Sequence, residues 1–314
     1  MPFPELPAPA DDQVLLVSNC YEGGKARWGS LLEEIGGRRE GDVLVLEGGE
    51  VRLRLLESTG WARLHGGNLP ALVPASGSAQ AVVVLADSLV VYGGGGPLLV
   101  DVASIPGRGV RVRSGRLGEI LTAMLAGTLT FDHLVRDMDT SGVYQGDDGR
   151  PAFPAPVWTP HRSFPALPAT TEALLVRTSF DDEDGWQALL AELGGVDEDG
   201  WVGADLDPEE IDVENYPLTA LVVDDQTFED LHSGQVPALV PPEKHTTLVA
   251  LADTRTFIEP GWPLTVVDLY ETPGQPAVLP CRKVGSMACN LQIANMDFRD
   301  YVAREGTRPW WENS

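Results

Sequence analysis

The sequence has few of the features that mark secreted, membrane or zinc-binding proteins. Among its 314 residues only three are cysteines, Cys20, Cys281 and Cys289, and none has CxxC spacing. Such a sparse, odd set argues against a disulfide framework or a zinc site. No run of about 18 apolar residues exists, so no membrane span is expected. The start of the chain lacks the basic and apolar stretches of a signal peptide. We therefore expect a cytoplasmic protein with free thiols.

Basic residues are also scarce, since 22 Lys and Arg stand against 47 Asp and Glu, which gives a net charge of −25. This balance opposes nucleic-acid binding, which needs a basic surface. Residues 181–214 contain 14 acidic residues and no Lys or Arg. One interpretation is a solvated surface that keeps the protein soluble. The other is a docking face for a basic protein partner that includes Asp181, Asp182, Glu183 and Asp184.

The sequence contains an internal repeat. "LLVSNCYEGGKARWGSLLEEIGG" (15–37) matches "LLVRTSFDDEDGWQALLAELGG" (174–195), with Trp28 on Trp186. Four further blocks match in the same order: 69–74 with 236–241, 83–87 with 249–253, 97–102 with 263–269, and 117–135 with 284–302. Ordered matches of this kind indicate a tandem duplication. Because two fused copies form an internal pseudo-dimer, we expect a monomer.

The matches and the composition predict the boundaries of the parts. We expect a disordered leader over residues 1–12, a first repeat over 13–148, a linker over 149–172 and a second repeat over 173–314. The linker contains six prolines. Proline-rich linkers are extended and semi-rigid, so this one is expected to hold the repeats at a spacing.

Each repeat alternates strand and helix patterns. In the second copy, strands are predicted at 174–176, 218–225 and 246–253, and a hairpin at 264–270 and 277–284. A helix through Trp186 ends at the Gly194–Gly195 pair, because glycine favours the C′ position. This order predicts two tandem α/β sandwich domains. Each should have a mixed, partly parallel sheet, an antiparallel edge hairpin and a C-terminal helix pair.

The stretch "NLQIANMDFRDYV" (290–302) places polar residues inside an apolar pattern. Asn295 aligns with Thr128 and Asp297 with Thr130. All three residue types cap helix N-termini by accepting from a free backbone N–H, whereas a catalytic Asp would seldom become Thr. We therefore expect caps at these four positions, with a helix beginning near Phe298. Asn290 aligns with Ala123; it is expected to satisfy a backbone group and stays a weak catalytic candidate.

This motif, with the upstream "LLVRTSF…W" and a strand ending in "VVDD", resembles a small uncharacterised domain family common in actinobacteria. That family follows its NMDF-type motif with an Asp-rich close. The first copy keeps the close as "DMDTSGVYQGD" (137–147), and the second copy keeps the NMDF. The resemblance covers most of 174–302 and, more weakly, 15–147. It implies no activity, because the family has none assigned.

The Asp-rich close nearly matches a calcium loop. Asp137, Asp139 and Ser141 fall at loop positions 1, 3 and 5, the carbonyl of Val143 at position 7, and Asp148 at position 12. However, Asp reaches less far than the usual Glu at position 12, and the proline-rich segment that follows cannot form the second helix. The pattern favours an acidic turn at a helix end, with calcium as the alternative and no other cofactor expected.

Carboxylates at predicted strand ends form a second candidate site. In the second copy these are Asp224, Asp225, Asp253 and Asp268; the first copy has Glu47, Asp87 and Asp101. Ligands of open α/β sheets gather beyond the carboxyl ends of the strands, so a cluster here would suit acid–base or metal chemistry. No GxSxG, GxGxxG or Walker motif accompanies it. The five histidines showed no match between the copies.

These observations lead to two hypotheses. The first is a non-catalytic acidic binding protein, similar to an immunity protein or inhibitor, or a scaffold. The alternative is an enzyme of actinobacterial metabolism with a carboxylate-lined site at the strand ends of one repeat. The C-terminal pair Trp310 and Trp311 either packs on the domain or anchors a partner, since Trp is enriched at binding hot spots.

Overall fold

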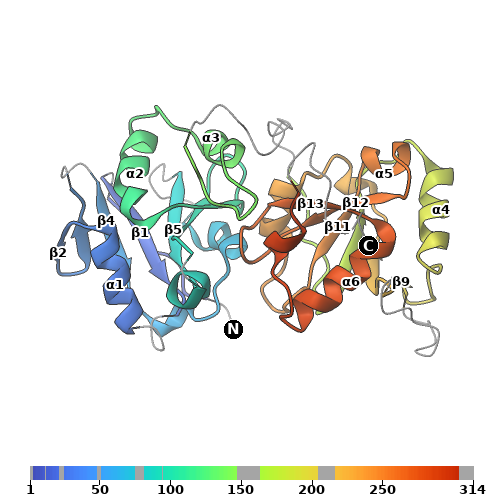
Figure 1. The fold of residues 1–314 in the computed structure, drawn as a ribbon, viewed down its shortest axis with the longest axis horizontal. Coiled ribbons are helices and arrows are strands. Elements are labelled where there is room, and N and C mark those ends of the chain that lie inside the picture. Colours follow the sequence, from blue (N-terminus) through green and yellow to red (C-terminus); the bar gives the residue numbers. More distant parts are fainter. Residues whose placement is uncertain are drawn as a thin grey trace. The chain divides into compact units, whose positions relative to one another are not determined.

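The computed structural model describes residues 3–10, 12–20, 25–47, 51–74, 81–93, 95–146, 163–203 and 216–303. The chain divides into two compact units, residues 1–157 with 270–273, and residues 158–269 with 274–314. Figure 1 shows the fold and labels some of the strands and helices of both units. Within the ranges given above, no helix is both long and apolar enough to cross a membrane.

The first unit contains a seven-stranded mixed sheet in the order β2-β3-β4-β1-β5-β6-β7. The central strand β1 runs parallel to β4 and β5, whereas the outer pairs are antiparallel. The strands are β1 (Gln13–Ser18), β2 (Arg38–Glu40), β3 (Val43–Val45), β4 (Arg52–Leu56), β5 (Val82–Ala86), β6 (Leu98–Asp101) and β7 (Gly109–Arg111).

The second unit has a six-stranded sheet in the order β13-β12-β11-β8-β10-β9. Its strands are β8 (Ala173–Arg177), β9 (Trp201–Val202), β10 (Ala220–Val223), β11 (Val249–Ala252), β12 (Pro263–Val267) and β13 (Pro276–Pro280). β8 is parallel to β10 and β11, and β12 and β13 form an antiparallel hairpin at the edge. Read from β9 to β13, this order matches the order of the first unit from β3 to β7, and no counterpart of β2 occurs among the described residues. The predicted duplication and α/β class are therefore confirmed.

Both faces of each sheet are covered. The α-helices are α1 (Lys25–Ile35), α2 (Leu117–Leu125), α3 (Phe131–Arg136), α4 (Glu183–Glu192), α5 (Thr254–Ile258) and α6 (Cys281–Gln292). In the second unit, α4 and α6 bury Trp186 and Met287 against Leu175 of the central strand. In the first unit, the opposite face of the sheet packs Leu15 and Val17 against apolar side chains of short 3-10 helices. Burial on both faces explains the nearly continuous apolar strands.

The connections differ from the prediction in two places. In the sequence, Thr227 as a cap and Gly234 as an end predict one short helix over 227–234, but this segment contributes to two 3-10 helices, η6 (Gln226–Phe228) and η7 (Ser233–Leu239). Their counterparts in the first unit are η1 (Thr59–Trp61) and η2 (Gly66–Leu72). The last strand ends at Pro280 rather than 284, because α6 begins at Cys281.

The first residues of the chain are not a disordered leader where the structure describes them. Leu6 is 2% exposed and its N–H donates to the Leu72 carbonyl at 2.9 Å. The second unit repeats this contact, since Leu167 is 2% exposed and donates to Leu239 at 2.8 Å. The predicted linker is therefore too long at its C-terminal end. The repeated signal "FPxLPA", at 3–8 and 164–169, was missed in the sequence.

The polar residues of the C-terminal motif organise a break between two helices. Asp297 is the N-cap residue of the 3-10 helix η8 (Phe298–Tyr301), and its N–H donates to the Asp300 carboxylate at 2.9 Å. Asn295 is not a second cap, because the helix begins too far along the chain for its side chain to reach. It donates instead to Asn290 Oδ1 at 2.7 Å. Asn290 in turn donates to the Ser286 carbonyl at 2.8 Å, the backbone contact expected of it.

The first unit has the same break with different contacts. Thr130 caps α3, because its hydroxyl accepts from the His133 N–H at 3.4 Å while His133 Nδ1 accepts from the Thr130 N–H at 3.3 Å. Thr128 was also expected to cap, but its hydroxyl donates to the Ala123 carbonyl at 3.0 Å. It therefore satisfies the C-terminal end of α2 rather than the N-terminal end of α3.

Burial of Leu6 and Leu167 generates a stability prediction. Leu6→Ala and Leu167→Ala should each lower the free energy of unfolding by about 2–5 kcal/mol, the cost of shortening a core leucine. Chemical denaturation of the full chain measures this loss. Glu5→Ala, at an exposed neighbouring residue, is the control and should change stability by less than about 0.5 kcal/mol. If Leu6→Ala behaved like Glu5→Ala, the leader would count as disordered after all.

Candidate functional site at the carboxyl ends of the parallel strands

Strand direction decides which carboxylates share an edge of the sheet. Asp224 and Asp225 follow β10, and Asp253 follows β11; both strands are parallel to β8. Asp268 follows β12, which is antiparallel to β11, so it lies at the opposite edge. The four carboxylates proposed from the sequence therefore do not form one cluster. In the first unit the same rule separates Asp87 from Asp101.

The carboxylates at the opposite edge shape a hairpin. Asp101 is 1% exposed and accepts from the backbone N–H groups of residues 103, 104 and 105 at 2.9–3.0 Å. It also accepts from Arg108 Nε at 3.0 Å. The corresponding Asp268 is 3% exposed. Its backbone pairs with Gln275 and Gly274 as the Asp101 backbone pairs with Arg108 and Gly107. Both residues belong to the structure of the turn.

Two acids at the carboxyl edge of the second unit cap helices. Asp253 Oδ1 accepts from the Arg255 and Thr256 N–H groups at 2.9 and 3.4 Å, and Oδ2 accepts from the Thr265 hydroxyl at 2.7 Å. Asp225 caps η6 by accepting from the Thr227 N–H at 2.9 Å. That backbone hydrogen bond is the main reason why the pKa of Asp225 lies below its usual value.

A buried arginine organises the rest of this edge. Arg177 ends the central strand and is 3% exposed. Its Nη1 donates to Glu183 at 2.8 Å and to Asp224 at 3.3 Å. The guanidinium lies over the rings of Phe180 and Trp186, at 4.5 and 5.3 Å from their centres. The indole N–H of Trp186 donates to the other oxygen of Asp224 at 2.9 Å, so Asp224 joins the tryptophan to the arginine.

The first unit contains the same arrangement with a different cation. Strand register places Glu57 at the position of Asp224. Glu57 accepts from the Trp28 indole N–H at 2.5 Å and from Arg39 Nη2, in β2, at 2.8 Å. Ser18 occupies the position of Arg177, and its buried hydroxyl has no hydrogen-bond partner among the residues that the structure describes. We call this repeated set of side chains the Trp–carboxylate–Arg site.

A buried ion pair also lies at this edge of the first unit. Arg111, at the end of β7, donates to both oxygens of Asp87 at 3.2 and 2.5 Å, and both side chains are less than a tenth exposed. The register places Val278 at the corresponding position of the second unit. Burial, and then the negative charge of Asp87, raise the pKa of the nearby Cys20 thiol. Cys20 is thus a poor nucleophile at neutral pH.

The proposed docking acids do not all have the same contacts. Asp182 is the N-cap residue of α4 and accepts from the Gly185 N–H at 2.8 Å. Glu183 pairs with Arg177 and also accepts from Gln187 at 2.9 Å. The Gln187 bond, and next the Arg177 bond, hold its pKa below the usual value. Asp181 and Asp184 are exposed. Trp310 and Trp311 lie outside the described residues.

The calcium-like loop is a turn stabilised by its own N–H groups. Asp139 Oδ1 accepts from the Ser141 and Val143 N–H groups at 2.9 and 3.0 Å, and Oδ2 accepts from Gln145 at 2.7 Å. Asp137 accepts two bonds from Arg136 at 2.7 and 2.8 Å. Asp148 lies outside the described residues. Among the residues that are described, no three His, Cys, Asp or Glu side chains form a group that could hold a metal ion.

The repeats also share a histidine that the sequence comparison missed. "LHGGNLPALVP" (64–74) aligns with "LHSGQVPALVP" (231–241), so His65 corresponds to His232. Each is the N-cap residue of its seven-residue 3-10 helix. The match could have been found by extending the "PALVP" block five residues toward the N-terminus.

Glu183 and Asp224 both neutralise the charge of Arg177. We therefore expect substitutions at these two residues to have non-additive effects on stability. Glu183→Gln or Asp224→Asn alone leaves one carboxylate beside the buried guanidinium, whereas the double variant leaves none. The loss of unfolding free energy in the double variant should therefore exceed the sum of the two single losses. Denaturation of the four proteins of the cycle tests this, and simple additivity would contradict it.

The same cycle predicts a pH dependence. The folded pKa of Glu183 is lowered. The ionised Glu183 carboxylate therefore stabilises the folded state fully at pH values above the unfolded pKa of about 4.3. This stabilisation is lost as the pH falls through the folded pKa. The stability difference between wild type and Glu183→Gln should therefore shrink below about pH 4. A difference that grows on acidification would contradict the assignment.

Comparison with known proteins agrees with the repeated fold and repeated site. A family model described as domain of unknown function (DUF6924) matches residues 13–147 and again residues 172–309. Searches of curated proteins and of solved structures find no match. The two matched segments cover most of the chain and coincide with the two sheets. The chain therefore belongs to this family of unknown function and carries its domain twice in tandem.

Proposed function

We propose that the protein is a non-catalytic binding protein, of the inhibitor, immunity or scaffold type, whose second repeat presents an acidic face to a basic protein partner. The observation that carries the proposal is that the Asp, Glu, Lys and Arg side chains in the segments around the carboxyl ends of β8 and β10, after Arg177, are all acidic. Residues 178–243 contain 19 Asp and Glu and no Lys or Arg.

Strand direction gathers several of these acids at one place. Asp181 and Asp184 lie at the start of α4, which follows β8, and Asp224, Asp225 and Asp230 lie in the segment after the parallel strand β10. All five are exposed. Arg177, which pairs with Asp224 of this group, is itself buried. The field toward solvent is therefore negative, which attracts and orients a basic partner. We call these five residues the acidic face.

The contacts of the other carboxylates support binding over catalysis. Asp253 and Asp225 accept backbone N–H groups as caps, Asp224 holds an indole and a guanidinium, and Asp268 is at the opposite edge. A catalytic pair would converge on one space in which a substrate atom fits. The three cysteines are unpaired, which supports our inference of a cytoplasmic location.

Affinity capture followed by kinetics tests the proposal. Full-length protein is used to capture a partner from its native lysate, and the captured protein is purified. Its association rate constant should fall by about tenfold or more between about 0.01 and 0.15 M salt, because exposed charges are screened beyond about 8 Å at the higher value. Asp181→Asn/Asp184→Asn/Asp225→Asn should slow association at low salt. Asn is chosen because it keeps the cap at Asp225.

A control variant that removes the same number of negative charges elsewhere separates an effect of the acidic face from an effect of the net charge. Glu5→Gln/Glu33→Gln/Glu34→Gln removes three exposed acids of the first unit and should leave the association rate nearly unchanged. An acidic captured protein, a rate that ignores salt, or equal rates for the two triple variants would contradict the proposed docking face.

A further inference from the structure

We propose that the first repeat binds an extended, proline-containing, basic segment of a partner protein in a groove along α2. The proposal rests on comparing the same helix surface in the two repeats. It does not rest on the acidic face, which belongs to the other unit.

In the second repeat this surface is already occupied by the chain itself. A Cβ atom added to Gly285 of α6 would lie 2.1 Å from the carbonyl oxygen of Tyr216, 2.3 Å from the carbonyl carbon of Pro217 and 2.5 Å from the backbone nitrogen of Leu218. Only glycine allows the backbone to approach this closely. The residue before a proline is restricted to extended conformations. Helix α6 therefore seats a Tyr-Pro-Leu segment, with Leu218 in the core.

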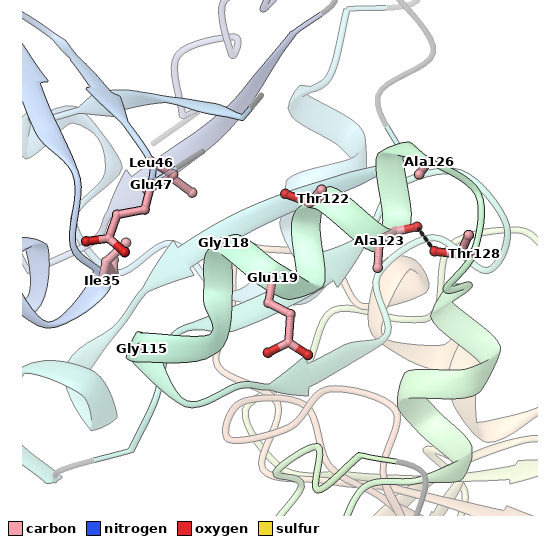
Figure 2. A pocket seen from close by; sticks show the side chains of 10 residues that line it. All are labelled: Ile35, Leu46, Glu47, Gly115, Gly118, Glu119, Thr122, Ala123, Ala126 and Thr128. Atoms are coloured by element: carbon pink, nitrogen blue, oxygen red, sulfur yellow. Dashed lines mark hydrogen bonds between the residues drawn. The ribbon is translucent and has the colours of Figure 1, made fainter. Parts of the chain in front are cut away.

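In the first repeat no described residue covers the corresponding surface. Gly118 aligns with Gly285, but a Cβ added there would lie 3.5 Å from the nearest atom, in the Leu46 side chain. A groove of about 500 Å³ runs along the helix. Figure 2 shows Ile35, Leu46 and Glu47 on one side of it and the residues of α2 on the other. Its lining residues are Ile35, Leu46, Glu47, Gly115, Gly118, Glu119, Thr122, Ala123, Ala126 and Thr128.

The difference between the repeats comes from one connection. In the second repeat residues 203–219 join β9 to β10, and their last part covers α6. In the first repeat only residues 46–51 join β3 to β4. The first repeat thus keeps the helix surface that seats an extended segment but has a shorter connection beside it.

The chemistry of the groove defines its occupant. Glycine and alanine on α2 permit close backbone approach, and Leu46 and Ile35 offer an apolar wall for an aliphatic side chain. Glu47 and Glu119 are exposed beside it. Glu119 pairs with Arg116 at 3.1 Å, and no ion pair of Glu47 occurs within the described part of the chain. The lining carries a net negative charge, so a Lys or Arg next to the proline is favoured.

Peptide binding to the full-length protein tests the inference. The probe is the synthetic peptide Lys-Tyr-Pro-Leu-Thr-Ala with blocked ends, compared with the same peptide in which Glu replaces Lys. Titration calorimetry or NMR titration should show saturable binding of the basic peptide and at least about tenfold weaker binding of the acidic one, the ratio that corresponds to about 1.4 kcal/mol. Glu47→Gln should reduce this preference.

Two glycine variants locate the binding site. Gly118→Leu places a side chain in the groove and should abolish peptide binding. Leu has a higher helix propensity than Gly, so the helix is expected to stay intact. Gly29→Leu in α1, where an added Cβ meets nothing within 4 Å, is the matched control and should bind normally. Variants of the acidic face should also bind the peptide normally, which separates this inference from the proposed function.

Alanine substitutions test the equivalence of the two helix surfaces. Gly118→Ala should leave the denaturation midpoint unchanged or raised, whereas Gly285→Ala should lower it, because its Cβ would collide with backbone. The inference is overturned if the basic peptide does not bind, if both peptides bind equally, or if Gly118→Leu binds as well as Gly29→Leu.

Discussion

In each repeat the indole N–H of one buried tryptophan donates to the carboxylate that follows the second parallel strand. Trp28 uses Glu57 and Trp186 uses Asp224. A buried indole N–H needs an acceptor, and here the acceptor is fixed by the end of a strand. The bond therefore sets how the first helix of each repeat lies on its sheet. The carboxylate in turn needs a cation, and an arginine completes each site.

The two repeats meet this need in different ways. The second repeat takes its arginine from the central strand, at Arg177, whereas the first takes Arg39 from the edge strand β2. With Ser18 at the position of Arg177, the first repeat also places Arg111 against Asp87. A guanidinium on a long side chain can approach one carboxylate from several strands. The tryptophan and the acid are thus the fixed parts of the site, and the source of the cation is the variable part.

Much of the fold followed from the sequence, because matched blocks and apolar strand patterns are local signals. The alternation of strands and helices and the edge hairpin came from this information, whereas the order of strands within each sheet did not. The candidate site was predicted less well, because strand direction decides which carboxylates share an edge of the sheet. "VVDD", "LADT" and "VVDL" look alike as strand ends, yet only the first two end at the same edge as the central strand. Contacts such as Trp186–Asp224 join residues far apart in the chain and leave no spacing signal.

The capping predictions show the same limit. Thr130 and Asp297 stand directly before a helical segment, and there the residue type was enough to identify the role. Asn295 and Thr128 have the same chemistry two residues earlier, where the chain is still leaving the previous helix. Their side chains therefore serve that helix end. Residue type gives the chemistry of a cap, but a shift of two residues decides which helix uses it.

The two repeats differ at two separate places. The second repeat has the longer connection before its second parallel strand, and the end of that connection covers its own helix at Gly285. It has also kept Lys and Arg out of residues 178–243. The first repeat has kept a short connection and an open groove beside α2. Under the two proposals, the acidic face and the groove along α2 would contact a partner at two linked points, and binding at two linked points raises overall affinity without any stronger single contact.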